Sequence, residues 1–160
     1  NDSVEKLVVV DIAPKDYPPN HQVIFDAFFA VDIEKISTRK EAENILAQHL
    51  KDKSVIQFLL KNLSRQKDKT YRWKCNLDAI YRNYHEIIGN SLGHFDIFEN
   101  DTLFVKGEKS ERYIVLDDDI ALIKHHFPNS NITTIADAGH WIHAEQPQIF
   151  LEKLDFFLAS

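Results

Sequence analysis

The hydrophobic residues of the chain follow two patterns, and the change between them divides the sequence into three stretches. Residues Lys6 to Ile12 (KLVVVDI) form a continuous, mostly β-branched run that ends at Ala13-Pro14. A short apolar run without polar alternation predicts a strand that is buried on both faces, as in a parallel sheet. From His21 to about Asn90 the apolar residues instead recur at helical spacing, which predicts a helical insertion after that strand.

Four helices are predicted within the insertion from this spacing and from residues suited to capping. Thr38, Asp52 and Asn76 can each cap the start of a helix, and Gly89-Asn90 suits a left-handed cap at the end of the last one. The tripeptide Tyr71-Arg72-Trp73 is expected to be extended. The predicted helices take in Val23 to Val31, Arg39 to Leu50, Val55 to Leu63 and Leu77 to Ile88.

Strands and helices alternate again after Gly93. The predicted elements are strands at Thr102 to Val105 and Asn131 to Ala136, a loop at Lys106 to Arg112, and helices at Leu116 to Phe127 and Pro147 to Leu158. The residues expected to form the buried face of the last helix are Ile149, Phe150, Leu154, Phe157 and Leu158. This order predicts an α/β core with parallel strands, formed by residues 1–20 and 98–160, and a helical cap at residues 21–97.

The composition fits one ordinary globular domain. The chain has 160 residues, 44% of them apolar and 28% charged, and a net charge of −6. Because Lys and Arg do not cluster, a nucleic-acid partner is not expected. The lone Cys75 cannot form an intrachain disulfide, which fits a reducing, cytoplasmic location. No apolar run approaches the ~18–20 residues of a membrane helix. The chain opens Asn1-Asp2-Ser3 and contains no Met, so we expect a fragment or a processed piece.

The string Ala138 to Pro147 (AGHWIHAEQP) carries the strongest chemical signal. It follows a predicted strand and precedes the last helix, so its histidine is expected at the edge of the sheet where sites form in such folds. Gly139 gives the backbone freedom that a general base needs. The string resembles the histidine loop of α/β-hydrolases and, with its Trp141, His143 and Glu145, that of the YbfF-type esterase branch.

Three further stretches extend this resemblance over the whole chain. Leu7 to Pro14 (LVVVDIAP) resembles that branch's sixth strand, and Gln57 to Asn62 (QFLLKN) resembles a lid helix. Leu103 to Ile114 (LFVKGEKSERYI) resembles its seventh strand and the loop after it. The resemblance implies an α/β-hydrolase fold, of which this chain is the C-terminal part of the parallel sheet with the helical cap insertion.

The resemblance also implies two members of a catalytic triad. His140 matches the histidine, which accepts the proton of the serine and returns it to the leaving group. In the YbfF-type branch the acid is the aspartate that ends the sixth strand, here Asp11. Many other members place the acid after the seventh strand, where this chain offers Glu108, so Glu108 is the alternative acid. Neither a cofactor nor a metal is implied.

The nucleophilic serine is expected in an N-terminal part before Asn1, since the triad follows the order serine, acid, histidine. Gly89-Asn90-Ser91-Leu92-Gly93 does match the letters of the nucleophile elbow G-x-S-x-G. That elbow needs a strand before it and a helix after it. Here a predicted helix comes before and the polar string HFDIFEND follows, so context argues against Ser91 as the nucleophile.

The intact protein is therefore expected to be a serine esterase or thioesterase that hydrolyses small acyl esters or thioesters through an acyl-enzyme. The alternatives are related chemistry on the same positions, such as C–C bond hydrolysis or dehalogenation, and a non-catalytic interaction fragment. Its expected partner is the N-terminal part of the same hydrolase, on the same chain or a separate one. The 160 residues alone are expected to be inactive.

Other noticeable residues have simpler explanations than chemistry. His143 is expected to pack or cap near the last helix. His125 and His126, with His140 and His143, could suggest a metal cluster, but no Cys or carboxylate spacing completes a zinc set. A set of mostly aromatic residues could line an acyl pocket, but is more simply the core of the cap. These residues are Phe25, Phe28, Phe29, Phe58, Leu59, Trp73 and Tyr84.

Overall fold

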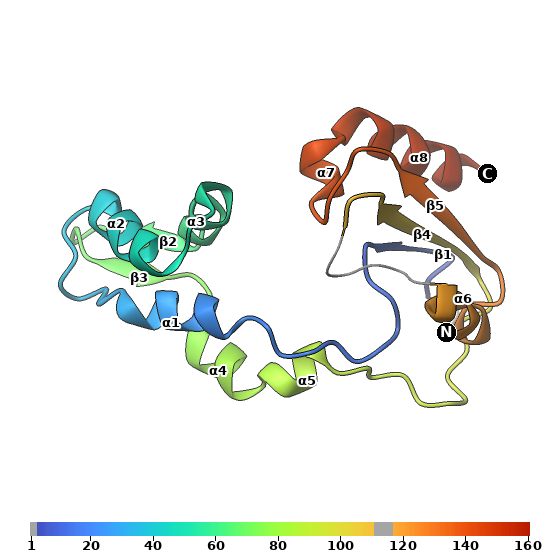
Figure 1. Cartoon of the computed structure of the whole chain (residues 1–160), viewed down its shortest axis with the longest axis horizontal. Helices are drawn as coiled ribbons and strands as arrows, with labels where there is room; N and C mark the ends of the chain where they lie inside the picture. The colour runs from blue at the N-terminus through green and yellow to red at the C-terminus, as the bar shows by residue number, and fades with distance from the viewer. Residues whose placement is uncertain (1–2, 111–116) are drawn as a thin grey trace. The chain divides into compact units, whose positions relative to one another are not determined.

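The computed structural model describes residues 3–110 and 117–160, and the chain divides into two compact units (Figure 1). Asn1–Asp16 and Asn90–Ser160 form the first, here called the sheet unit. Tyr17–Gly89 form the second, the helical unit. The sheet unit is thus assembled from two segments that the whole helical unit separates in the sequence.

The sheet unit is built on three parallel strands, β1 (Lys6–Val10), β4 (Asp101–Gly107) and β5 (Ser130–Ile135), with β4 in the middle. Val10 pairs with Val105, and Gly107 pairs with Ile135. The carboxyl ends of the three strands therefore lie side by side at one edge. This arrangement confirms the parallel α/β architecture predicted from the apolar runs.

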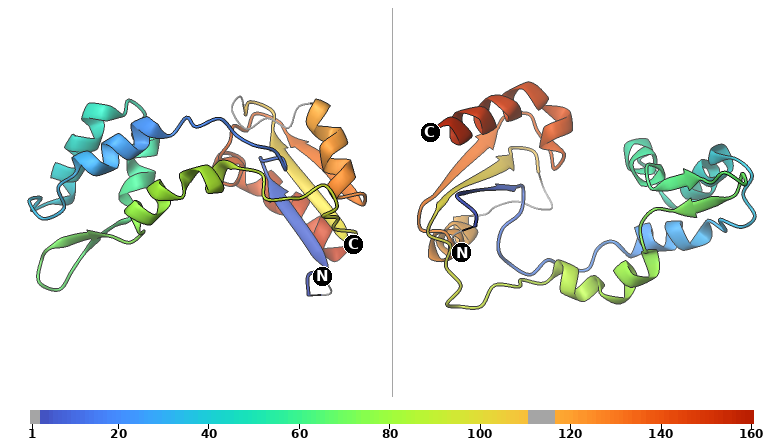
Figure 2. Two further views of the ribbon diagram at one scale, coloured as in Figure 1. Left: turned by 90° about the horizontal axis from the view of Figure 1, so that it is seen from below. Right: turned by 180° about the vertical axis from the view of Figure 1, so that it is seen from behind.

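Helices cover both faces of this sheet, as a parallel sheet requires (Figure 2). They are α6 (Asp117–His126), the short α7 (Ile142–Glu145) and α8 (Pro147–Ala159). Leu103 and Val105 of β4 pack with α7 and α8 on one face, and Phe104 packs with Ile123 of α6 on the other. The alternation of side chains along β4 thus fills two separate apolar layers.

The last helix buries a narrower stripe than predicted. Phe157 is buried, and Phe150 and Leu154 are half-buried, at the spacing of one helix face. Ile149 and Leu158, also predicted to be buried, are 38% and 59% exposed. Each of them lies about one residue step, roughly 100°, to the side of that stripe, so the small sheet does not reach them. Membrane crossing would take a longer apolar helix than any in the described part of the chain.

Two predicted boundaries near β4 differ from the structure. β4 continues to Gly107, and residues 108–110 form a turn rather than the start of a long loop. The rest of the expected loop, to Arg112, lies outside the described residues, as does Leu116 at the expected start of the next helix.

The helical unit combines five helices with a short antiparallel hairpin. Its elements are α1 (Gln22–Ala30), α2 (Arg39–His49), α3 (Lys53–Leu60), β2 (Leu63–Arg65), β3 (Tyr71–Trp73), α4 (Leu77–Arg82) and α5 (Tyr84–Ile88). Ala42, Leu46 and Leu60 have no exposed surface and lie at the centre of its apolar core. This unit therefore has a hydrophobic core of its own.

The predicted helix starts are confirmed where a side chain caps the helix. Thr38, Asp52 and Asn76 each accept a backbone N–H from the first turn, at 3.2, 2.7 and 3.1 Å. Such a side chain replaces an acceptor that the first turn lacks. These signals are local, so the sequence alone reveals them.

The hairpin corrects one prediction. Leu63 does not continue the third helix but begins β2, which pairs with the extended segment Tyr71–Trp73. Leu63 is buried, with 7% of its surface exposed, and it follows Leu59 at helical spacing. A buried leucine fits the end of a helix and the start of a strand equally well, so the periodicity was misleading here.

The end of the helical unit corrects two more predictions. The predicted helix Leu77 to Ile88 is interrupted at Asn83. The Asn83 Nδ2 donates to the carbonyl oxygen of Ala79 at 2.8 Å, beside its own backbone N–H at 3.1 Å, a contact that bends helices. Gly89 has φ −77° and ψ 154°, so it is extended and forms no left-handed cap. The carbonyl oxygen of Ile88 accepts the Tyr17 N–H at 2.9 Å instead.

Candidate active site

Asp11 stands immediately after β1, at the edge where the three strands end. Its φ of 54° lies in the left-handed region, which asparagine and aspartate enter more readily than other side chains. Its N–H still donates to Val105 at 2.7 Å. The predicted strand to Ile12 is therefore too long, because the backbone leaves the sheet at Asp11 and turns the buried carboxylate across the end of β4.

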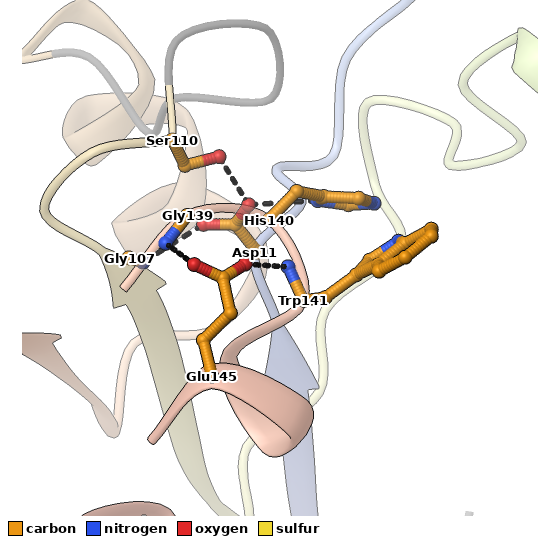
Figure 3. Close-up of polar contacts among 7 residues, drawn as sticks. All are labelled: Asp11, Gly107, Ser110, Gly139, His140, Trp141 and Glu145. Atoms are coloured by element: carbon orange, nitrogen blue, oxygen red, sulfur yellow. Dashed lines mark hydrogen bonds and ion pairs between the residues drawn. The ribbon is translucent and has the colours of Figure 1, made fainter. Parts of the chain in front are cut away.

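Three hydrogen-bonding groups converge on the Asp11 carboxylate (Figure 3). The Gly107 N–H donates to Oδ1 at 2.9 Å, and the Ser110 hydroxyl donates to Oδ2. His140 Nδ1 lies 2.8 Å from the same Oδ2. A buried carboxylate is costly unless such partners surround it. The structure therefore brings together His140 and Asp11, the two residues selected from the sequence.

The histidine bridges a buried and an exposed environment. Its side chain is 39% exposed, whereas that of Asp11 is fully buried. When Nδ1–H is donated to the carboxylate, Nε2 is the ring nitrogen that can accept a proton. An imidazole held in this way is suited to general acid–base chemistry.

The loop that carries His140 lies directly against the end of β4. Lys109 N–H donates to the carbonyl oxygen of Ala138 at 2.8 Å. A Cβ atom on Gly107 would lie 2.3 Å from the carbonyl oxygen of Gly139 and 2.6 Å from that of Ala138. Only glycine permits so close an approach. Gly107 therefore positions the loop and also supplies an N–H to Asp11.

Glu108, the alternative acid, contacts the turn before His140. Its Oε2 accepts the Asp137 N–H at 3.0 Å. Lys109 Nζ lies 2.7 Å from Asp137 Oδ1, and its hydrogen bond holds the pKa of Asp137 below the usual value. Glu108 and Lys109 thus join two turns, whereas the carboxylate that meets the His140 ring is Asp11.

The other histidines and Ser91 lie apart from this cluster in their contacts. Ser91 is exposed in an irregular segment, not at a strand-to-helix turn. His143 is exposed on α7. The rings of His125 and His126 each contact a backbone carbonyl oxygen at 2.7 Å. Among the side chains that the structure describes, no group of His, Cys, Asp or Glu has the arrangement to hold a metal ion.

The residues considered for an acyl pocket range from buried to exposed, with Trp73 and Tyr84 half-buried. Phe25, Phe28 and Leu59 are buried, and Trp73 packs edge-on against Phe28 with ring centroids 4.8 Å apart. Phe29 and Phe58 are 46% and 48% exposed. An acyl-pocket role for this set stays a prediction.

Sequence reasoning missed three residues of the cluster. Gly107 is the last residue of β4 and Ser110 lies three residues later, on either side of Glu108, which was considered as the acid. Glu145 was quoted only as part of the histidine motif, yet its carboxylate accepts N–H groups on both sides of His140. The one sequence signal that could have indicated Ser110 is a small hydroxyl residue three positions after Gly107, the glycine that ends β4.

Comparison with known proteins identifies relatives of the whole chain, although no protein-family model matches it. It is 36% identical over 163 residues to esterase YbfF of Escherichia coli, which covers 99% of this chain and 59% of that protein. It is 36% identical over 162 residues to the sn-1-specific diacylglycerol lipase ABHD11 of Danio rerio, in a match that covers 97% of this chain and 50% of that protein. Among solved structures, a marine microorganism esterase matches with a TM-score of 0.91 and 42% identity, covering 98% of this chain and 61% of that one.

The chain spans about half the length of the curated relatives that it matches. The similarity nevertheless extends over nearly all of this chain, in sequence and in fold. On both grounds the chain belongs to the α/β-hydrolase superfamily, and its sequence is similar to that of esterase YbfF.

Proposed function

We propose that the protein is a serine hydrolase of acyl esters in which Asp11 and His140 are the acid and the base of the catalytic triad. The observation that carries this proposal is the 2.8 Å contact between His140 Nδ1 and the buried Asp11 carboxylate. The relatives named esterase and lipase support ester hydrolysis. In this proposal the nucleophilic serine and the oxyanion donors belong to residues other than these 160.

Proton transfer through His140 accounts for both halves of the reaction. His140 Nε2 takes the proton of the serine hydroxyl as its oxygen attacks the carbonyl carbon, and then gives that proton to the departing alkoxide. The resulting acyl-enzyme is cleaved by water, whose proton goes to Nε2 and then to the serine oxygen. Asp11 holds Nδ1–H and stabilises the imidazolium. Neither step requires a cofactor.

The same steps apply to a thioester, because only the leaving atom changes from oxygen to sulfur. We therefore include thioesters in the proposed substrate class. Acyl esters come first, since the relatives' names point to esters.

The test is a set of substitutions in the complete protein, assayed with p-nitrophenyl butyrate and with a butyryl thioester. We expect His140→Ala to lower kcat/KM by about 10³–10⁴-fold, because the general base is lost. Asp11→Asn is expected to approach this loss, because the amide no longer fixes the Nδ1–H tautomer. Retention of parent activity by His140→Ala would contradict the proposed base.

Matched variants separate these roles from their alternatives. His143→Ala removes an exposed histidine three residues further on and is expected to keep parent activity. Glu108→Gln keeps an acceptor for the Asp137 N–H, so it should also remain active. Loss of activity in Glu108→Gln, with Asp11→Asn active, would move the acid to Glu108. Loss in Ser91→Ala would move the nucleophile into this chain.

A further inference from the structure

Glu145, at the end of α7, holds the backbone on both sides of His140 (Figure 3). Its Oε2 accepts the Gly139 N–H at 2.8 Å, and its Oε1 accepts the Trp141 N–H at 3.2 Å. One carboxylate therefore binds the amide that precedes His140 by one residue and the amide that follows it.

These two contacts restrict the torsions that direct the histidine side chain. Each N–H belongs to a rigid peptide plane, the first joining Ala138 to Gly139 and the second joining His140 to Trp141. The φ and ψ angles of Gly139 and His140 lie between the two planes. Holding both planes with one carboxylate therefore restricts the direction of the Cα–Cβ bond of His140.

The position of Gly139 makes this restraint important. A glycine loses more conformational freedom on folding than any other residue, so its neighbours must hold it in place. The segment is anchored before it, where Ala138 is fully buried, and after it, where Ala144 N–H donates to Trp141 at 2.8 Å. Glu145 spans the interval between these two anchors.

We propose that Glu145 is a positioning residue, which sets the direction from which the His140 ring meets Asp11 and hence the placement of Nε2. This inference rests on the proposed role of His140 as the base. Two acceptor oxygens are essential to it. In Glu145→Gln, the side-chain NH₂ replaces one oxygen and faces a backbone N–H, so donor meets donor.

The experiment compares the complete protein with its Glu145→Gln variant in ester hydrolysis and in ¹H NMR of histidine-labelled protein. We expect kcat to fall about 10-fold with KM within about twofold of the parent, because small misplacement of a catalytic group acts on the chemical step. We also expect the downfield Nδ1–H resonance of His140, assigned by its loss in His140→Ala, to shift or broaden. Glu152→Gln, on an exposed residue of α8, is the matched control and should change neither.

A second variant tests the same contact from the opposite side. A Cβ atom on Gly139 would lie 3.1 and 3.2 Å from the two Glu145 carboxylate oxygens. Gly139→Ala should therefore lower kcat when Glu145 is present and lower it much less in a Glu145→Ala background. Additive effects of the two changes would overturn the proposal. Should Glu145→Gln not fold, unchanged kcat and an unchanged His140 resonance in Gly139→Ala would overturn it too.

The outcomes separate this inference from the proposed function. Parent kcat and a parent His140 resonance in Glu145→Gln would overturn the positioning role while hydrolysis stands. A shifted resonance in Glu145→Gln, in a protein whose His140→Ala variant hydrolyses the ester as fast as the parent, would support the positioning and overturn the catalytic role.

Discussion

The two units of the molecule bury different kinds of side chain. The core of the helical unit is apolar, and its helix-capping groups lie at the surface. All the buried polar or charged residues in the described part of the chain belong to the sheet unit, and they are Asp11, Thr102, Ser110, Asp119, His126 and Ser130. Burying a polar group is unfavourable unless it is satisfied. The stability of the sheet unit therefore depends on polar contacts as well as on apolar packing.

The units also differ in how far apart the interacting residues lie in the sequence. The caps of the helical unit join residues two or three positions apart, as in the contact of Asp52 with Ser54. The contact between Asp11 and His140 joins residues 129 positions apart. The helical unit is thus specified mostly by local signals, and the site by the strand pairing that brings its parts together.

The largest effect on stability is expected from a core substitution in the helical unit. Leu46→Ala removes a side chain with no exposed surface, and we expect it to lower the free energy of unfolding by about 2–5 kcal/mol. If the units differ as described, the loss is confined to the helical unit. Peptide-resolved hydrogen exchange of the complete protein measures this, by comparing α2 and α3 with β4.

The matched control for this prediction is Leu151→Ala, which changes the same side chain where it is 55% exposed on α8. This variant should leave the hydrogen-exchange protection of both units close to that of the parent. Equal loss of protection in α2 and β4 on Leu46→Ala would mean that the two units unfold together, and would remove the distinction between them.

An intermediate effect is expected from a buried polar substitution in the sheet unit. Ser110→Ala removes a hydroxyl that donates to the Asp11 carboxylate. A hydrogen bond to a charged group contributes about 1.5–3 kcal/mol, so we expect a loss of stability in that range. Because Ser110 and His140 share Oδ2, kcat for ester hydrolysis should fall as well. Urea denaturation and the ester assay measure the two effects.

Ser130→Ala is an unusually close control for this change. Ser130 is as buried as Ser110, but its hydroxyl has no hydrogen-bond partner among the described residues. Removing an unsatisfied hydroxyl is expected to be neutral or stabilising. If both serine variants lose the same stability, the contact with Asp11 does not contribute as described.

The same contrast explains what could be predicted from the sequence. Thr38 and Asp52 each cap a helix by accepting an N–H from a residue two or three positions later. Because both partners are close in the sequence, both helix starts were predicted. Leu63 was assigned to a helix because it follows Leu59 at helical spacing, although an apolar residue at this position fits a strand equally well. The end of β1 was misplaced because the left-handed turn at Asp11 has no signal in the apolar pattern.

The site was predicted in part, for a related reason. Asp11 and His140 were paired through a family resemblance, not through any local pattern. Ser110 and Glu145 were missed, since their roles depend on where the ends of β4 and α7 come to lie. Ser110 meets Asp11 across 99 positions, a distance at which spacing along the chain carries no information.

The smallest expected effect concerns an exposed carboxylate of the helical unit, Asp52. The Ser54 hydroxyl and N–H donate to Asp52, which holds its pKa below the ordinary value of 3.8. A lowered pKa in the folded state stabilises the protein above pH 3.8, and this contribution is lost as the pH falls through the folded value. Asparagine caps a helix equally well but does not titrate. The Asp52→Asn variant should therefore be as stable as the parent at pH 7 and slightly more stable at pH 3. Asp52→Ala, without any cap, should be less stable than the parent at pH 7 and draw level as the pH falls. The urea midpoints of the three proteins at each pH measure these differences. If the midpoints of the parent and of Asp52→Asn fall equally as the pH is lowered, ionised Asp52 adds nothing to the cap.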